Sequence, residues 1–346
     1  MTGPPQPRWF PERATLFGVH TIPVIDMTPT RNSAAGAEQV AGRVGQACRE
    51  IGFFQVVGHG VPTDLFSTMF RVTRRFFALP SESKRRVAQP TSDQVRGWSG
   101  VGSEGISYSL DEESAGDLKE KFDMGPPSPP AGDPYYSPAR SGPHFAANLW
   151  PGEVPELRGP WELYYGHMAR IGDELMGLCA RALHLDPGFF DDKLDRAISM
   201  LRALWYPDQP EPPLPGQLRA GVHTDYGSLT LISAEDRPGG LQVLDRGGEW
   251  LDVPVIPGAL MVNIGDLLAE WTAEAWPSTL HRVVNPPREQ AMDSSRLAFA
   301  FYHHPNYDAR IDPLPGLGVP VVGQETMTAG EHLREKYLRQ TTFGAR

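Results

Sequence analysis

The chain has 346 residues, of which 40% are apolar and 21% charged, proportions typical of a folded globular protein with a substantial core. Asp and Glu outnumber Lys and Arg by 42 to 32, which gives a net charge of -10. This balance excludes an extended basic surface for nucleic acid or anionic lipid. We therefore expect a small-molecule substrate, no nucleic-acid or membrane partner, and a monomer or weak homo-oligomer.

The termini and the cysteines predict a cytoplasmic protein. Residues 1–20 are rich in proline and lack the apolar core of a signal peptide. No segment approaches the ~20 apolar residues that a membrane-spanning helix requires. The two cysteines, Cys48 and Cys179, are far apart in the chain and do not form the closely spaced pattern of a disulfide framework.

The first half of the sequence predicts helices separated by short strands. A strand over 21–26 precedes a helix over about 35–51, in which apolar residues recur every three or four positions. A buried strand over 52–57 is followed by a helix over 64–79, which Pro80 ends. Residues 88–160 read as loops and short strands, of which 96–124 should close over a substrate, and 161–184 is the clearest helix.

The second half changes to short β-branched and aromatic runs between Gly and Pro turns. Strands are expected at 198–206, 227–234, 240–244, 259–264, 280–284 and 295–303, followed by a helix over 328–339. Several short strands at regular spacing indicate a sandwich or barrel. We therefore predict an α+β chain in which a helical region, residues 1–190, packs on a mainly β core with a C-terminal helix, residues 191–346, in one compact unit.

His223, Asp225 and His281 form the candidate metal site. The triplet that begins at His223 is placed at the start of a predicted strand, where residues two apart share a face. An antiparallel sheet could bring His281, in another predicted strand, beside them. Two imidazoles and one carboxylate leave open positions on an octahedral ion, as Fe(II) oxygenases require. Zinc in a hydrolase is the competing reading, although such sites often carry both histidines on one helix.

Arg296 is the candidate anchor for an organic co-substrate. A 2-oxo acid that chelates Fe(II) can supply the two extra electrons needed to split dioxygen, and its far carboxylate then needs a fixed cation. The planar guanidinium of arginine suits a carboxylate. Arg296 opens a predicted strand in which Ala298, Ala300 and Tyr302 share its face, so that small side chains leave room for a bound acid.

Motifs along nearly the whole chain, roughly residues 20 to 340, resemble the isopenicillin N synthase-like 2-oxoglutarate/Fe(II)-dependent dioxygenases. In the first half these are Ile22-Pro23-Val24-Ile25-Asp26, Gly52-Phe53-Phe54-Gln55-Val56-Val57-Gly58-His59-Gly60 and Asp117-Leu118-Lys119-Glu120-Lys121-Phe122-Asp123. In the second half they are His223-Thr224-Asp225-Tyr226-Gly227-Ser228, Gly239-Gly240-Leu241-Gln242-Val243, Val262-Asn263-Ile264-Gly265-Asp266 and His281-Arg282-Val283.

The resemblance implies a double-stranded β-helix, or jelly roll, of cupin-like form with flanking N-terminal and C-terminal helices. It implies that His223, Asp225 and His281 bind Fe(II), and that Arg296 and Tyr206 bind the distal carboxylate of 2-oxoglutarate. The family usually has Arg-x-Ser where this chain has Ala298 two residues after the arginine. The missing hydroxyl removes one hydrogen bond, a net loss of about 1 kcal/mol.

The expected reaction is oxidation of a substrate C–H bond by Fe(II), 2-oxoglutarate and O2, with release of succinate and CO2 and with ascorbate as a stimulant. Hydroxylation, desaturation and cyclisation are all open. Tyr226, Tyr302 and His304 are the candidate substrate-binding residues. The alternatives are fragmentation of 2-oxoglutarate to ethylene, an oxidase that uses no 2-oxoglutarate, and a non-enzymatic small-molecule receptor on the same scaffold.

Overall fold

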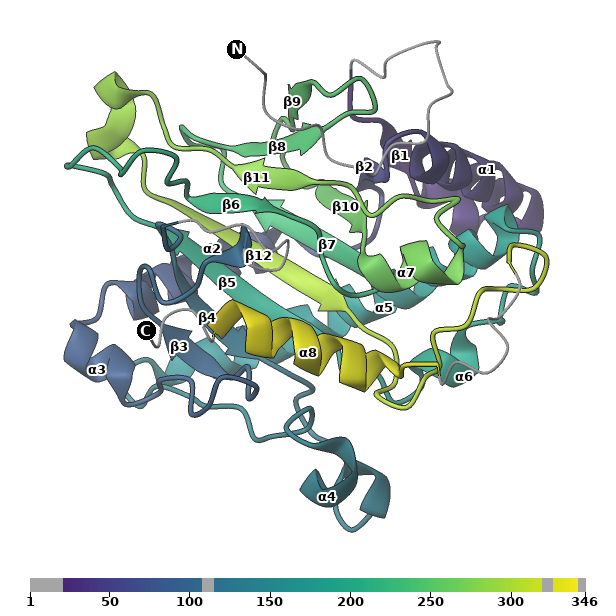
Figure 1. Ribbon diagram of the computed structural model, residues 1–346, viewed down its shortest axis with the longest axis horizontal. Coiled ribbons are helices and arrows are strands. Elements are labelled where there is room, and N and C mark those ends of the chain that lie inside the picture. Colours follow the sequence, from purple (N-terminus) through teal and green to yellow (C-terminus); the bar gives the residue numbers. More distant parts are fainter. Residues whose placement is uncertain (1–20, 108–114, 319–325, 342–346) are drawn as a thin grey trace, which may run out of the picture.

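The protein is described from a computed structural model that defines residues 21–107, 115–318 and 326–341. Its centre is a pair of β-sheets that enclose a pocket, with helices packed against the outer face of the larger sheet (Figure 1). The proline-rich residues 1–20 of the sequence prediction lie outside the described residues, as does part of the predicted covering loop, residues 108–114.

The large sheet has eight strands in the order β1-β2-β10-β7-β12-β5-β4-β3. β1 is parallel to β2, and the remaining neighbours are antiparallel. Strands from the first part of the chain therefore form both edges of the sheet. The bounds are β1 Val24–Asp26, β2 Phe53–Val57, β3 Gly97–Ser99, β4 Glu120–Met124, β5 Met200–Tyr206, β7 Leu229–Ala234, β10 Leu260–Ile264 and β12 Arg296–His303.

The small sheet has four antiparallel strands in the order β6-β11-β8-β9. A buried apolar cluster that includes Phe53, Met261 and Ala298 of the large sheet and Val243 and Val283 of the small one joins the two sheets. The bounds are β6 Ala220–His223, β8 Leu241–Leu244, β9 Trp250–Asp252 and β11 His281–Val283. This pairing of two sheets is consistent with the predicted double-stranded β-helix.

The helices cover the large sheet and one end of the pocket. α1, α2 and α5 pack on the outer face of the large sheet, and α8 lies across its β4–β5 end (Figure 1). The bounds are α1 Ala34–Glu50, α2 Thr63–Phe77, α3 Ser81–Arg85, α4 Pro138–Ser141, α5 Arg158–Ala182, α6 Asp191–Leu194, α7 Asp266–Trp271 and α8 Ala329–Thr341, with 3-10 turns at Thr28–Arg31, Pro134–Tyr136, Pro155–Leu157 and Arg288–Asp293.

β12 shows how strand alternation separates the core from the pocket. Phe299 and Phe301 point to the helices, where Trp161 of α5 lies edge-on to Phe299 at 6.0 Å and Tyr165 lies edge-on to Phe301 at 5.1 Å. Ala298 lies on the opposite face and lines the pocket. The period of two in a strand fixes this division, as the sequence predicted.

The predicted boundary at residue 190 does not coincide with a break in the large sheet. β2 from the first region pairs with β10 from the second, and β4 pairs with β5. The division into 1–190 and 191–346 stays a prediction, and the two regions share one sheet. In the described part of the chain, no helix combines the length and the apolar character needed to cross a bilayer.

Candidate metal centre and its pocket

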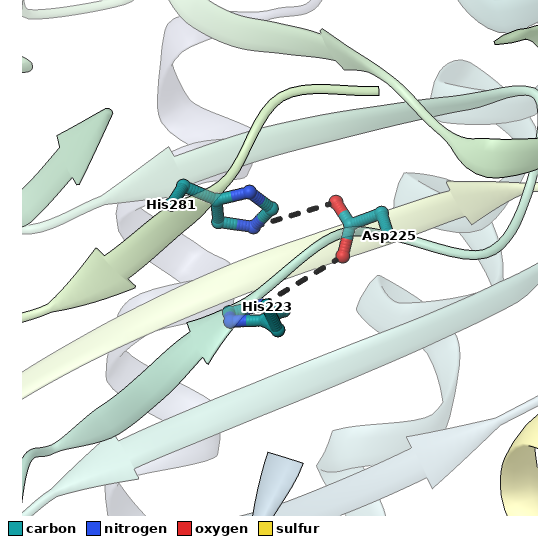
Figure 2. Close-up of side chains that lie close together, drawn as sticks. All are labelled: His223, Asp225 and His281. Atoms are coloured by element: carbon teal, nitrogen blue, oxygen red, sulfur yellow. Dashed lines mark ion pairs between the residues drawn. The ribbon is translucent and has the colours of Figure 1, made fainter. Parts of the chain in front are cut away.

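His223, Asp225 and His281 converge on one point between the two sheets (Figure 2). His223 is the last residue of β6, Asp225 lies in the loop that follows, and His281 opens β11. β6 and β11 are neighbours, and His281 stands opposite His223 in their register. One ligand atom from each residue lies within 4.8 Å of the others, and all three residues are buried.

Backbone carbonyls orient both imidazoles. His223 Nδ1 lies 2.8 Å from the carbonyl oxygen of Gly221, and His281 Nδ1 lies 3.0 Å from that of Thr279. The Nε2 atoms therefore face Asp225. His223 Nε2 lies 4.0 Å from Asp225 Oδ1, and His281 Nε2 lies 3.8 Å from Asp225 Oδ2. These separations are too long for hydrogen bonds. A cation between the three groups would satisfy all of them, which is the arrangement of a metal site with oriented histidines.

The electrostatics of the cluster favour the protonation states of metal ligands. Burial, and then the neighbouring His281, lowers the pKa of His223 to about 3, so that its imidazole is neutral at physiological pH. Burial works to raise the pKa of Asp225, but His281 and His223 outweigh it and the pKa is lowered. Asn263 Nδ2 also donates to Asp225 Oδ2 at 2.7 Å. A neutral imidazole and an ionised carboxylate are what a divalent cation requires.

The local structure of the triplet differs from the prediction. His223 ends a strand and does not begin one, so the placement of His223 and Asp225 on one face of a strand was wrong. The chain leaves the sheet after His223. The backbone N–H of Asp266 then donates to the Asp225 carbonyl at 2.8 Å and, with the bond from Asn263, fixes the loop. The two ligands meet because this loop folds back onto β10.

A pocket adjoins the metal cluster and is lined from both sheets. Its cavity is narrow, with a volume of about 50 Å³. Its apolar lining includes Leu204, Ile232, Met261 and Ala298. The polar side chains in the lining are those of Lys119, Arg202, Tyr206, His223, Asp225, Thr230, His281, Arg296 and Tyr302.

Arg296 and Tyr206 lie together in this lining, as predicted. They are opposite each other in the register of β12 and β5, and the guanidinium carbon lies 6.0 Å from the centre of the tyrosine ring. Burial lowers the pKa of Arg296, which is only 3% exposed. The nearby Glu235 pairs with Arg74 at 2.7 Å, and among the described residues no carboxylate lies within ion-pair distance of Arg296. An anionic ligand in the pocket would therefore neutralise the positive charge of Arg296.

The three predicted substrate-binding residues occupy different positions. Tyr302 lines the pocket, and His304 stacks on it with ring centres 6.1 Å apart. His304 is buried, with Nε2 3.4 Å from the Tyr337 hydroxyl of α8. Tyr226 lies beneath the Lys336 ammonium of α8, 5.3 Å from the ring centre. His304 and Tyr226 are outside the pocket lining, and their contact with substrate stays a prediction.

Two cations in the pocket, Lys119 and Arg202, were not predicted from the sequence to have a role. Both are buried, although lysine and arginine are almost never fully buried unless they are paired. One signal was present in the sequence. Lys121 and Asp123 alternate along β4 and Lys119 directly precedes it, so the three side chains are spaced to share one face of the large sheet. A charged face on a strand with neighbours on both sides indicates a polar site.

Sequence models of two families match the chain. The first, described as the N-terminal region of non-haem dioxygenases in morphine synthesis, matches residues 22–153. The second, the 2OG-Fe(II) oxygenase superfamily, matches residues 197–305 and so includes His223, Asp225, His281 and Arg296.

Curated relatives match along nearly the full length. Validamycin A dioxygenase of Streptomyces hygroscopicus subsp. limoneus is 32% identical over 93% of this chain and 87% of its own length. A homoarginine-6-hydroxylase of Arabidopsis thaliana is 31% identical over 93% and 89%. A 2-oxoglutarate-dependent dioxygenase of Monascus ruber is 34% identical over 91% and 94%.

Solved structures agree with this relationship. A full-length protein of Neurospora crassa, solved in complex with alpha-KG, superposes with a TM-score of 0.79, at 29% identity over 94% of this chain and 99% of that one. JOX2 in complex with 2OG, Fe and JA gives a TM-score of 0.71, at 26% identity over 89% and 82%. The fold and the His-Asp-His group define a non-haem iron oxygenase.

The chain belongs to the 2OG-Fe(II) oxygenase superfamily. The predicted family, the jelly-roll fold and the oxidoreductase class with Fe(II), 2-oxoglutarate and O2 are thereby confirmed. The protein is a 2-oxoglutarate-dependent dioxygenase that oxidises a small molecule. This class sets aside the zinc hydrolase and the non-enzymatic receptor that the sequence alone had left open.

Proposed function

We propose that His223, Asp225 and His281 hold the Fe(II) of this dioxygenase, and that Arg296 with Tyr206 anchors 2-oxoglutarate beside it. The observation that carries the proposal is the convergence of three buried ligand atoms within 4.8 Å, next to a buried arginine in the same pocket. Two imidazoles and one carboxylate on one side of an ion leave positions for a bidentate co-substrate and dioxygen.

The residues fit ferrous iron in their donor atoms and in their orientation. Both Nδ1 atoms are engaged by backbone carbonyls, so each imidazole has Nε2 left for a metal. Asp225 Oδ2 accepts a hydrogen bond from Asn263, which leaves Oδ1 for coordination. When bound, iron and 2-oxoglutarate supply the oxidising power that attacks a substrate C–H bond, with succinate and CO2 as co-products.

Arg296 supplies the charge that selects a dicarboxylic co-substrate. Its planar guanidinium can donate two parallel hydrogen bonds to a carboxylate, and in a buried pocket such bonds are little weakened by water. Tyr206 stands directly across from it, and Ala298 and Ala300 continue the same face toward the metal ligands. These small side chains leave a channel for a short acid between the arginine and the metal.

Tyr302 borders the pocket on the side of the metal cluster. Burial raises its pKa well above the ordinary value for tyrosine, so its phenol stays protonated and can donate a hydrogen bond. We assign it to the substrate side, together with the stacked His304 and with Tyr226 beneath α8. These three residues orient the substrate and limit access of water.

The relatives indicate the class of reaction but not the substrate of this protein. The relatives named above are described as acting on validamycin A and homoarginine, two unlike compounds. Hydroxylation, desaturation and cyclisation all begin with attack on a C–H bond, and the pocket residues do not distinguish them. For the protein as a whole we propose a monomer or weak homo-oligomer in the cytoplasm, without nucleic-acid or membrane partners.

Succinate release tests the assignment. The purified protein, loaded with Fe(II) under ascorbate, is assayed with 2-oxoglutarate and a panel of metabolites. We expect succinate formation that a substrate stimulates and that Zn(II) does not support. Ethylene in the headspace would instead identify fragmentation of 2-oxoglutarate. Oxygen uptake that needs substrate but no 2-oxo acid would refute the role of Arg296 and favour the oxidase alternative.

A further inference from the structure

We propose that the substrate carries a carboxylate, and that Arg202 receives it at the end of the pocket opposite Arg296. This inference rests on the proposed function, because it takes the pocket beside His223 and Asp225 as the place of reaction. It names the chemical class of the substrate, which the family does not fix.

Arg202 occupies a second cationic position, separate from the anchor at Arg296. On β5, Tyr206 is opposite Arg296 and Arg202 is opposite Ala300, all on the pocket face. Four positions along a strand span about 13 Å. The Arg202 guanidinium lies 5.6 Å from the ring centre of Tyr302, at the far end from Tyr206. The two arginine side chains therefore start from opposite ends of this face of the sheet.

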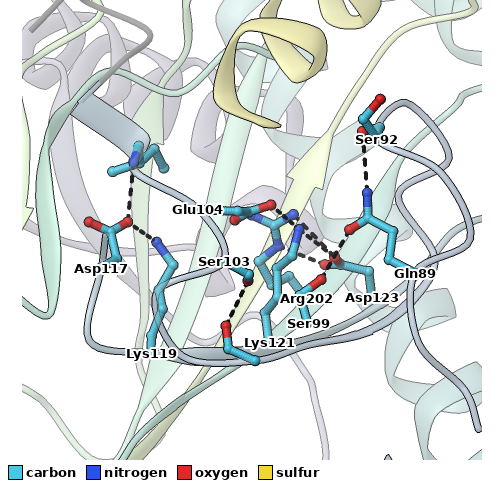
Figure 3. A network of polar contacts seen from close by, with 12 residues as sticks. Gln89, Ser92, Ser99, Ser103, Glu104, Asp117, Lys119, Lys121, Asp123 and Arg202 are labelled. Carbon is cyan, nitrogen blue, oxygen red and sulfur yellow. Dashed lines mark hydrogen bonds and ion pairs between the residues drawn. The ribbon is translucent and has the colours of Figure 1, made fainter. Parts of the chain in front are cut away.

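Two carboxylates hold Arg202 in place without using all of its donors. Asp123 accepts from Nε at 2.6 Å and from Nη2 at 3.2 Å, as Figure 3 shows. Glu104 lies 3.9 Å from Nη1, beyond hydrogen-bond distance. Within the described residues Nη1 therefore has no hydrogen-bond acceptor, although the side chain is only 4% exposed. It is a fixed donor in the pocket wall.

Lys119 is a further buried cation of the pocket lining, placed apart from Arg202. Its ammonium contacts Asp117, and both side chains are almost completely buried (Figure 3). Its side chain lines the pocket near Tyr206 and His223, and therefore toward the Arg296 end. Arg202 is thus the cation that remains for a ligand at the other end.

The carboxylates stand behind these cations and do not line the pocket. Glu104 pairs with Lys121, which also lies 3.3 Å from Asp123, so the three cations of this network are matched by three carboxylates among the described residues. The largest effect on the Glu104 pKa is burial, which raises it, but Lys121 and then Arg202 prevail and hold it near 2. The network therefore stays ionised with no substrate present, and presents only donors to the cavity.

This arrangement selects a carboxylate over other groups. A hydrocarbon surface would leave the charged Nη1 group of Arg202 without an acceptor, which is unfavourable. The N–H groups of Nη1 can instead donate charge-assisted hydrogen bonds to a carboxylate. A phosphate monoester brings a third oxygen and a second negative charge, and Glu104 stands too close to Arg202 for that charge to be favourable.

Binding of matched acids and amides tests the inference. The full-length protein is first titrated with Mn(II) and 2-oxoglutarate by calorimetry, so that Arg296 is occupied. A broad panel, in which each metabolite acid is paired with its primary amide, is then screened by ligand-observed NMR. We expect binding to be confined to acids. Each bound acid should lose affinity on the order of tenfold or more in Arg202→Met.

Controls separate a lost contact from a misfolded protein. Arg202→Met leaves Asp123 with Lys121 as its one remaining ion-pair partner among the described residues, so the double variant Arg202→Met/Asp123→Asn, which removes both charges of the broken pair, is measured beside it. Arg282→Met is the matched control, because Arg282 packs on Trp250 outside the pocket lining. It should bind the acids as the unaltered protein does. All variants should keep the unaltered affinity for 2-oxoglutarate with Mn(II).

Each result has one meaning. Failure of the unaltered protein to bind Mn(II) with 2-oxoglutarate would refute the proposed function itself. If that binding is intact, the carboxylate inference is overturned by any of three results. These are amides that bind as well as acids, a panel in which no acid binds better than its amide, and acid binding that survives in Arg202→Met.

Discussion

The two arginines of the pocket differ in how their charge is balanced. Arg202 is held by Asp123 and approached by Glu104, whereas Arg296 has no carboxylate within ion-pair distance among the described residues. Both are almost fully buried. An unbalanced buried cation suits a ligand that is always present and always anionic, such as 2-oxoglutarate. A balanced one suits a substrate that comes and goes, because the net charge of the site stays balanced when the substrate leaves.

The largest effect on activity is expected from a change at the metal cluster, because the co-substrate and the substrate both react there. Asp225→Ala removes the carboxylate of the metal cluster and leaves two imidazoles. We expect iron retention to fall and substrate-stimulated succinate release to drop below detection, measured by metal analysis and succinate assay. Asp293→Ala, at an exposed carboxylate paired with Arg237, is the control and should behave as the unaltered enzyme. Full activity in Asp225→Ala would remove the basis of the comparison.

The stability of the protein should depend on the balanced arginine far more than on the unbalanced one. Asp123→Ala leaves Arg202 buried beside a single distant carboxylate, and breaking a buried pair costs about 3–5 kcal/mol. Arg296→Leu breaks no ion pair and should change the free energy of unfolding much less. Urea unfolding of the two variants measures the difference. Equal destabilisation would mean that the two arginines are not held differently.

Co-substrate affinity should depend on the unbalanced arginine. Arg296→Leu removes charge-assisted hydrogen bonds to a carboxylate, each worth about 1.5–3 kcal/mol, so the KM for 2-oxoglutarate should rise about 100-fold. The KM for the substrate should stay within about twofold of the original, a change below about 0.5 kcal/mol. Steady-state kinetics with each compound varied in turn measure both values. An unchanged KM for 2-oxoglutarate would place the anchor elsewhere.

The free energy of unfolding at acid pH should depend on Glu104, which lies beside the balanced arginine, Arg202. Glu104 has its pKa lowered to about 2 in the folded protein, so it contributes stability that is present above its unfolded pKa of about 4.5 and is lost as the pH falls toward 2. Glu104→Gln should therefore flatten the fall in unfolding free energy between these pH values. Urea titrations at a series of pH values test this. A slope identical to that of the unaltered protein would show that Glu104 does not titrate with folding.

The smallest expected effect concerns Ala298, two residues after the unbalanced arginine. Ala298→Ser adds one hydroxyl to the pocket face, and a hydrogen bond from it to the co-substrate carboxylate is worth about 1 kcal/mol. The KM for 2-oxoglutarate should fall about fivefold, since about 1.4 kcal/mol corresponds to tenfold. Ala234→Ser, opposite Ala298 on the neighbouring strand, tests whether any added hydroxyl has the same effect.

Most of the strands and long helices could be predicted from the sequence, because their apolar residues recur with the period of the element. β12 begins at Arg296 as expected, and α5 runs from Arg158 to Ala182 against a prediction of 161–184. β6, β9 and α7 were missed because they are three to six residues long and carry no clear period. β6 in particular contains Ala220 and Gly221, which have little strand propensity.

The metal ligands could be proposed from the sequence, but the substrate end of the pocket could not. The sequence itself contains the signals for the ligands, namely the spacing of His223 and Asp225 and a second histidine in a predicted strand. The pairing of Arg202 with Asp123 joins β5 and β4, two strands that lie far apart in the chain. The sequence of neither strand predicts that they are neighbours in the sheet. From the sequence alone, the charged residues of β4 would be expected to face solvent. Their burial follows only from the positions of β3 and the small sheet in the folded protein.

Gly221 connects the Asp117–Lys119 ion pair to the metal cluster. Its N–H donates to Asp117 Oδ1 at 3.0 Å, and its carbonyl accepts from the ring of His223 at 2.8 Å. The approach to the neighbouring loop is close, since a Cβ here would lie 2.1 Å from Ser107 Oγ and would displace that hydroxyl. The carboxylate that neutralises a buried lysine and the imidazole that faces the metal position are therefore both held by the backbone of one glycine.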